Sequence, residues 1–125
     1  MNERQHASLD RTFSQADFDR FARLSGDANP IHVDPGFAQR SRFGRPVAHG
    51  MLLLTVLRGL LERLAPGGRV VEQQVMFPAP TFTGEAMRFA ASVSGRSPGA
   101  STIELAVRRL ADGQITCRGS CRVET

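Results

Sequence analysis

The sequence contains no lysine, no tryptophan and no tyrosine, and aromatic residues make up only 6% of its 125 positions. Nucleic-acid-binding surfaces commonly combine basic clusters with aromatic side chains on which bases stack. Here the 16 basic residues are all arginines, scattered along the chain with no run longer than Arg108-Arg109. The formal net charge of +4 therefore does not indicate a nucleic-acid partner, although it suits a phosphorylated ligand.

Long hydrophobic runs are also missing. The longest mainly apolar run covers residues 51–57 and ends at Arg58, whereas a membrane-spanning helix needs about 20 residues. Residues 1–10 are polar and lack the apolar centre of a signal peptide. We therefore expect a cytoplasmic protein with no membrane partner. The two cysteines, Cys117 and Cys121, alternate with polar residues, and we expect them to be core thiols that form no disulfide.

The length of the chain fits one domain over residues 1–125, with residues 1–10 as a flexible or edge segment. A hydrophobic fraction of 41% and a charged fraction of 22% are typical of a globular protein. A domain of this size often completes its core by pairing with a second copy.

Three helical segments can be predicted. Ser14 and Asp17 form a capping box before an apolar stripe, which predicts a helix that ends near Leu24. Pro35 favours the start of a short helical turn. Residues 49–64 form the longest helix, and the apolar run 51–57 predicts that protein surrounds it on all sides.

The remaining sequence predicts strands. Residues 70–77 lead into three segments in which apolar and polar side chains alternate, and Asp112-Gly113 is a strong hairpin signal between the last two. An antiparallel meander must bury its apolar face, and residues 49–64 are the element apolar enough to cover it. The predicted fold is α+β, with an antiparallel sheet wrapped around a long central helix.

The segment LSGDANPIH, residues 24–32, carries two titratable groups five positions apart, across a loop stiffened by Pro30. Asp27 beside His32 would form a general acid–base pair that holds one water molecule. Asn29 and Ser25 could orient the pair. The alternative is that Asp27 and Asn29 serve a turn or a helix cap, with His32 as a structural loop histidine.

The segment FGRPVAHGM, residues 43–51, places Gly50 where the long helix begins. Free N–H groups at a helix start, supported by the helix dipole, suit an oxyanion such as a thioester carbonyl in an enolate-like transition state. The alternative is a glycine required only for close packing of this helix on the sheet. His49 is interpreted as a structural or orienting residue.

Together these two segments closely resemble MaoC-like dehydratases and (R)-specific enoyl-CoA hydratases, and FPAPTFTGE, residues 77–85, resembles the family segment that leads into the meander. The resemblance extends from about Phe13 to the C-terminus. It implies the hot-dog fold, with Asp27 and His32 as the catalytic pair and the Gly50 N–H bound to the thioester carbonyl. The implied reaction is reversible addition of water to a trans-2-enoyl-CoA, giving an (R)-3-hydroxyacyl-CoA.

The same resemblance implies a homodimer, and coenzyme A enters as part of the substrate, not as a cofactor. An acyl carrier protein could carry the acyl group instead. One Asp, one His and one Asn do not form a recognised metal-ligand set. Met51 and Arg58 are candidate substrate-pocket residues. Arg58 could instead pair with Glu62 or pack, and it could narrow the pocket or meet a charged acyl group.

Two rival functions stay open. One is an acyl-CoA thioesterase on the same fold, and the other is a non-catalytic domain that binds acyl thioesters. The outward-facing arginines of the predicted strands could contact coenzyme A phosphates or form a solvated face; they are Arg88, Arg108, Arg118 and Arg122.

Overall fold

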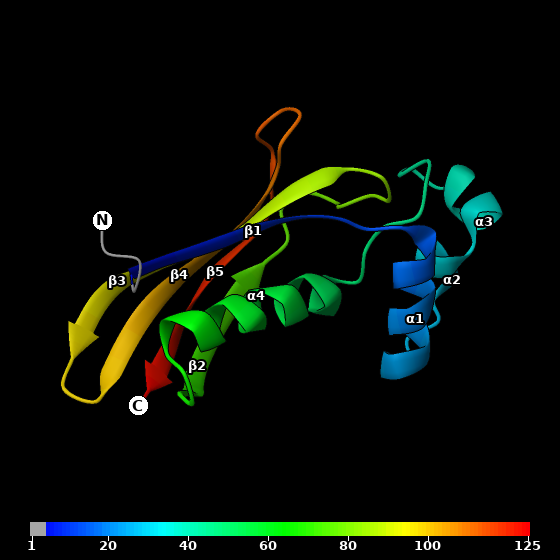
Figure 1. Cartoon of the computed structure of the whole chain (residues 1–125). Coiled ribbons are helices and arrows are strands. Elements are labelled where there is room, and N and C mark those ends of the chain that lie inside the picture. Colours follow the sequence, from blue (N-terminus) through cyan, green and yellow to red (C-terminus); the bar gives the residue numbers. More distant parts are fainter. Residues whose placement is uncertain (1–4) are drawn as a thin grey trace.

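Five antiparallel strands form one sheet that curves around a long helix, as a computed structural model of residues 5–125 shows (Figure 1). The strand order is β1-β3-β4-β5-β2. The helices are α1 (Gln15–Ser25), α2 (Pro30–Val33), α3 (Pro35–Gln39) and α4 (Gly50–Leu64). The strands are β1 (His6–Thr12), β2 (Arg69–Met76), β3 (Ala86–Ser97), β4 (Ala100–Arg109) and β5 (Ile115–Glu124). The predicted α+β fold with a central helix is confirmed.

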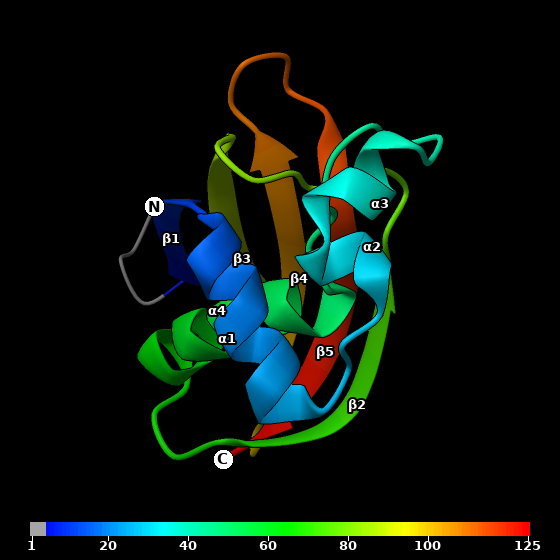
Figure 2. The same cartoon turned by 90° about the vertical axis from the view of Figure 1, so that its right-hand side faces the viewer.

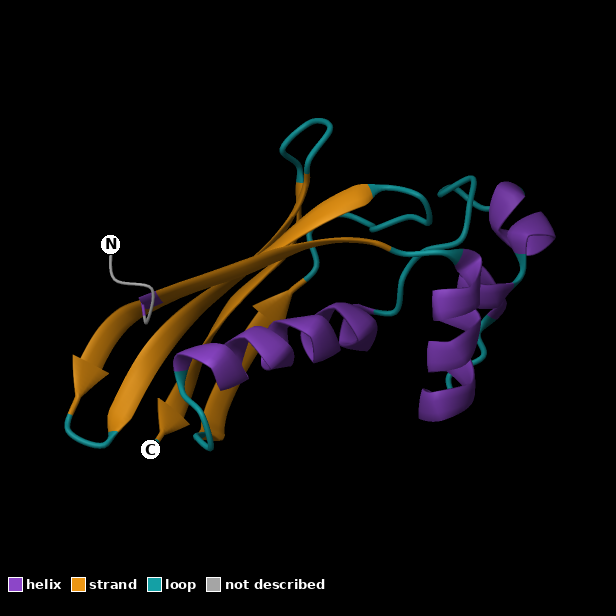
Figure 3. Cartoon of the chain, viewed as in Figure 1, coloured by secondary structure: helices purple, strands orange, loops and turns teal. Residues whose placement is uncertain are grey.

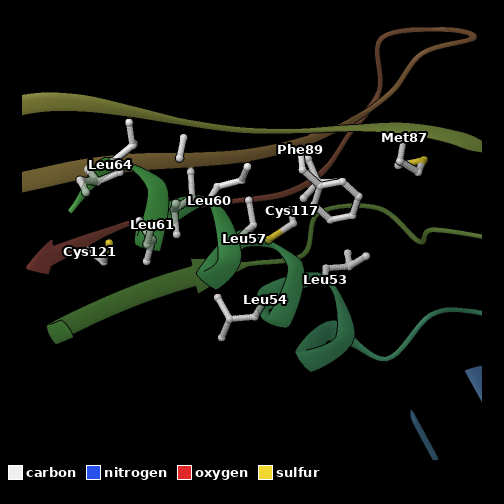
Figure 4. Close-up of a cluster of buried hydrophobic side chains, with 14 of the residues drawn as sticks. Leu53, Leu54, Leu57, Leu60, Leu61, Leu64, Met87, Phe89, Cys117 and Cys121 are labelled. Carbon is white, nitrogen blue, oxygen red and sulfur yellow. The ribbon is translucent and has the colours of Figure 1, made fainter. Parts of the chain in front are cut away.

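The core lies between α4 and the inner face of the sheet. Figure 4 shows the leucines of α4 packed against alternate side chains of the central strands. Met87 and Phe89 of β3 are fully buried, whereas Arg88 between them is exposed, as the period of two requires. Cys117 and Cys121 are buried free thiols, which confirms that prediction. Burial raises the pKa of the Cys117 thiol to about 11.

Helix α4 is buried on one face only. Its inward residues are Leu53, Leu54, Leu57, Leu60, Leu61 and Leu64. Met51 is 52% exposed, and Thr55 and Arg58 continue an exposed stripe along the other side. The prediction that protein surrounds this helix is wrong for the single chain, because the sheet covers one side of it. Glu62 does not pair with Arg58; its carboxylate accepts a hydrogen bond from the Gly67 N–H.

The N-terminal strand β1 lies at one edge of the sheet and pairs with β3. The sequence predicted a flexible or edge segment over residues 1–10, and residues 6–12 form this edge strand; residues 1–4 lie outside the described part. Arg88 forms an ion pair with Asp10 of β1, with Nε 2.8 Å from Oδ1. None of the helices in residues 5–125 is long and apolar enough to cross a membrane.

Helices α1, α2 and α3 lie together beyond the N-terminal end of α4 (Figure 3). The capping box of α1 is confirmed, because Ser14 and Asp17 exchange side-chain-to-backbone hydrogen bonds. Gly26 ends α1 in a left-handed conformation, with φ 81°. The helical turn at Pro35 is confirmed as α3, whereas α2 was not predicted.

Candidate active site

The segment from Ser25 to Asn29 is held by local hydrogen bonds. The Asp27 N–H donates to Ser25 Oγ at 3.1 Å, and the Asn29 N–H donates to Asp27 Oδ1 at 3.2 Å. Asn29 Oδ1 in turn accepts from the Ile31 N–H and caps α2. Asp27 and Asn29 therefore have the turn and cap roles that the sequence offered as an alternative. Since Oδ1 of Asp27 is used in this turn, its other oxygen is the one available to a ligand.

His32 lies on α2 and not in a loop. Its Nδ1 is 2.6 Å from the carbonyl oxygen of Val47. A carbonyl oxygen can only accept, so Nδ1 carries a hydrogen and Nε2 of the neutral ring has a free lone pair. This Nε2 is 3.8 Å from Asp27 Oδ2, too far for a direct hydrogen bond. The two atoms can share a bridging water.

The two members of the pair differ in exposure. The His32 side chain is 14% exposed, whereas the Asp27 side chain is 56% exposed. A ligand can therefore reach the space between them from the Asp27 side. The structure places these two predicted residues at a distance at which both could contact one water molecule.

His49 joins this segment to the start of α4. It is 3% exposed and occupies the N-cap position of α4. Its Nε2 donates to the Asp27 carbonyl oxygen at 2.8 Å, and its ring stacks on His32 with ring centres 3.8 Å apart. Phe21 packs edge-on against the same His49 ring, with ring centres 5.0 Å apart. These contacts fit the structural or orienting role interpreted from the sequence, because His49 fixes both the Asp27 backbone and the plane of the His32 ring.

Gly50 is the first residue of α4, where backbone N–H groups have no partner within the helix. A Cβ at this position would lie 2.7 Å from the Phe77 ring. The close contact at Gly50 is therefore with the Phe77 side chain, which follows β2, and not with a strand of the sheet. An N–H role for Gly50 toward a ligand stays a prediction.

A cavity of about 490 Å³ opens beside Gly50. Met51, Phe77 and Val47 belong to its lining, whereas Arg58 does not. Asp27 and His32 are not part of the lining either, although Val47 both lines the cavity and accepts the hydrogen bond from His32. The structure thus brings Gly50 and Met51 together at the cavity, next to the acid–base pair. A substrate role for Arg58 stays a prediction.

The side chains of Asp27, His32 and His49 offer ligand atoms that lie within 4.8 Å of one another. A ring nitrogen binds a metal in the plane of its ring, at about 2.1 Å. The two imidazole rings are stacked, with only 23° between their planes, so their lone pairs do not converge on one point. This arrangement suits a shared water better than a metal ion.

The surrounding segments are fixed by contacts that sequence reasoning missed. The Glu85 carboxylate lies 2.8 Å from Arg109 Nε and 3.3 Å from Arg45 Nη2. The ion pair with Arg45 ties the loop before Gly50 to the segment before β3. The Ala48 N–H donates to the Thr81 carbonyl oxygen at 2.8 Å. Residues 47–49 therefore lie between α2 and the segment around Thr81, and they are hydrogen-bonded to both of these segments.

The sequence profile of the MaoC like domain matches residues 1–114. The chain belongs to the MaoC-like dehydratase family. It is 34% identical over 125 residues to an (R)-specific enoyl-CoA hydratase of Rhodospirillum rubrum, covering 98% of this chain and 87% of that protein. It is 43% identical over 83 residues to an (R)-specific enoyl-CoA hydratase of Aeromonas caviae, covering 65% of this chain and 62% of that protein.

A solved structure, the (R)-hydratase from A. caviae involved in PHA biosynthesis, superposes on this MaoC-like chain with a TM-score of 0.90. The sequences are 32% identical in that comparison, which covers 96% of this chain and 93% of the other. The predicted resemblance and the hot-dog fold are confirmed. These relatives support a hydratase or dehydratase reaction class.

Proposed function

We propose that this MaoC-like chain catalyses the reversible addition of water to a trans-2-enoyl-CoA, giving an (R)-3-hydroxyacyl-CoA. The observation that carries the proposal is the gap of 3.8 Å between His32 Nε2 and Asp27 Oδ2, beside the start of α4. The names of the relatives from A. caviae and R. rubrum supply the substrate class and the stereochemistry.

In the proposed mechanism the thioester carbonyl accepts a hydrogen bond from the Gly50 N–H. Negative charge grows on this oxygen as the enolate-like transition state forms, and the positive end of the α4 dipole stabilises it. Asp27 and His32 hold a water over the β-carbon. One of the two takes a proton from this water as its hydroxyl adds to the β-carbon. A proton then passes to the α-carbon, so the pair returns to its starting state.

The test is crotonyl-CoA hydration, followed by the loss of enoyl-thioester absorbance, in wild type, Asp27→Asn and His32→Ala. Both variants should lose about 10²- to 10⁴-fold in kcat, as expected when a general acid–base group is removed. Asn at position 27 retains the oxygen that accepts the Asn29 N–H, so the fold should be kept. Chiral analysis of the product checks the (R) configuration.

Asp34→Asn is the matched control, because the Asp34 carboxylate also caps a short helix but belongs to α3. It should hydrate crotonyl-CoA as wild type does. Undiminished turnover by Asp27→Asn would remove the pair from the mechanism. Release of free coenzyme A would favour the thioesterase, and binding without turnover would favour a non-catalytic domain. Activity with an acyl carrier protein thioester but not with crotonyl-CoA would show that the acyl group is carried by acyl carrier protein and not by coenzyme A.

We also propose that the chain works as a homodimer. Strand β2 ends the strand order, and within residues 5–125 it pairs only with β5, so its other edge is open there (Figure 2). Large exposed apolar side chains lie on β2 and beside the start of α4, namely Val71, Met76, Phe77 and Met51. A second copy would cover this apolar surface. Light scattering at micromolar concentration should give twice the mass of one chain, and a monomer would contradict the proposal.

A further inference from the structure

Two buried hydroxyl groups lie in the wall of the cavity beside Gly50. Thr81 and Thr116 both line it, and their Oγ1 atoms are 2.8 Å apart. Both residues are almost fully buried. Most of their neighbours in the lining are apolar, among them Leu53 and Phe77. A few polar groups in an otherwise apolar pocket are typical of groups that orient a ligand.

Thr116 points inward because of a β-bulge in β5. Val107 of β4 lies opposite Cys117, and the next residue, Arg108, lies opposite Ile115. Thr116 therefore has no partner on β4, and it is buried together with its neighbour Cys117. An inserted residue of this kind turns a side chain to the other face of the strand, and such bulges are common next to active sites.

One hydroxyl hydrogen of the Thr81–Thr116 pair has no hydrogen-bond acceptor within the described chain. Two hydroxyl groups carry two hydrogens, and one of these lies between the two oxygens. For the second hydrogen there is no acceptor among residues 5–125. Thr81 is also tied to the segment before Gly50, because its carbonyl oxygen accepts the Ala48 N–H. The spare donor is therefore held in a fixed position relative to the start of α4.

We propose that the Thr81–Thr116 pair donates this hydrogen bond to an amide carbonyl of the pantetheine arm of the bound thioester. The inference rests on the proposed function, which places the thioester carbonyl at Gly50. Gly50 lines the cavity, whereas Asp27 and His32, which hold the water over the β-carbon, do not. The acyl tail continues beyond the β-carbon, on the side of the acid–base pair, and the carrier arm leaves from the carbonyl carbon at Gly50, so the cavity receives the carrier arm. On that side of the thioester, the pantetheine arm carries amide carbonyl oxygens that can accept. The pair is thus a positioning element for the carrier arm.

The experiment compares wild type, the double variant Thr81→Val with Thr116→Val, and the double variant Thr81→Ser with Thr116→Ser. Replacing both partners by valines of the same shape leaves no buried hydroxyl unpaired, so the fold and the melting temperature should be nearly unchanged. The Kd for butyryl-CoA, which cannot be hydrated, is measured by calorimetry. It should rise about 3- to 10-fold in the valine pair, as for the loss of one hydrogen bond. The serine pair should bind as wild type does.

A second readout identifies the atom that is bound. The valine pair should lose the same factor in kcat/KM for crotonyl-CoA, but less than about twofold for S-ethyl thiocrotonate, which has no amide. An unchanged Kd for butyryl-CoA, or an equal loss with both crotonyl thioesters, would overturn the inference. Wild type that binds butyryl-CoA but does not hydrate crotonyl-CoA would refute the proposed function alone, and the Kd comparison would still decide the role of the pair. Wild type that binds no thioester would overturn both.

Discussion

Replacing Gly50 with alanine tests the packing at the start of α4 and the proposed thioester contact at once. The new Cβ would lie 2.7, 2.9 and 3.1 Å from three atoms of the Phe77 ring. Such contacts are too short, so the ring must move, and it can do so because Phe77 is partly exposed. Alanine gains about 0.5–1 kcal/mol over glycine in a helix, while the lost ring packing costs about 1 kcal/mol. The free energy of unfolding should therefore change by less than about 1 kcal/mol, or about 4 °C in Tm.

The effect on activity should be much larger. The methyl group and the displaced ring would both enter the space beside the Gly50 N–H, where the proposed mechanism places the thioester oxygen. A displacement of about 1 Å in a reacting group costs about 100-fold. We expect this loss in kcat/KM for crotonyl-CoA, equivalent to about 2.7 kcal/mol of transition-state stabilisation.

Gly59→Ala is the matched control, because it lies in the same helix and a Cβ there would meet nothing within 4 Å. It should raise the free energy of unfolding by up to about 1 kcal/mol and leave kcat/KM unchanged. Adding Phe77→Ala to the Gly50→Ala variant should restore part of the activity by removing the clash. If Gly50→Ala hydrates crotonyl-CoA as fast as Gly59→Ala does, the start of α4 does not bind the thioester.

Three further predictions concern stability. Ser14→Ala removes the side-chain cap of α1 and should cost about 1 kcal/mol in urea unfolding, against less than about 0.5 kcal/mol for Ser8→Ala on the exposed face of β1. Glu85→Gln removes the better buried of the two carboxylates that pair with the largely buried Arg109, the other being the exposed Asp112, and should cost about 2–3 kcal/mol; an unchanged urea midpoint would show that the Glu85 pair contributes nothing. Because burial raises the pKa of Cys117 from 9.0 to about 11, the unfolded chain loses this proton first, so the free energy of unfolding should fall as the pH rises from about 9 to 11. Cys117→Ala should flatten that part of the pH profile, and an identical slope would contradict the assignment.

Elements with a strong local pattern could be predicted from the sequence. The capping box at Ser14 and the alternation around Phe89 depend on neighbours only three or two positions away, and both are present as expected. The meander and the long helix followed from the same reasoning. Strand β1 was predicted only as a flexible or edge segment, because an edge strand carries little pattern: only Ala7 and Leu9 are partly buried in it.

The geometry of the site depends on contacts that no local pattern contains. Asn29-Pro30 is a cap followed by a first-turn proline, so this dipeptide could have indicated α2. The stacking of His49 on His32, however, joins residues 17 positions apart in the sequence, and only the folded chain brings them together. The β-bulge at Thr116 could not be predicted either, although its signal is local. The alternating pattern of β5 predicts a regular strand, and nothing in that pattern marks an inserted residue.

The segment that carries Asp27 and His32 contributes few side chains to the hydrophobic core. Between residues 23 and 47 only Ala38 and Pro46 are buried, and the segment is tied to the rest of the chain mainly by hydrogen bonds to residues 47–49 and by the ion pair between Arg45 and Glu85. Regions with few buried apolar contacts open at a lower free energy than the core does. Amide protons of α2 and α3 should therefore exchange with solvent through local openings while those of β3, β4 and β5 remain protected. The acid–base pair can in this way be lost and regained without unfolding of the sheet.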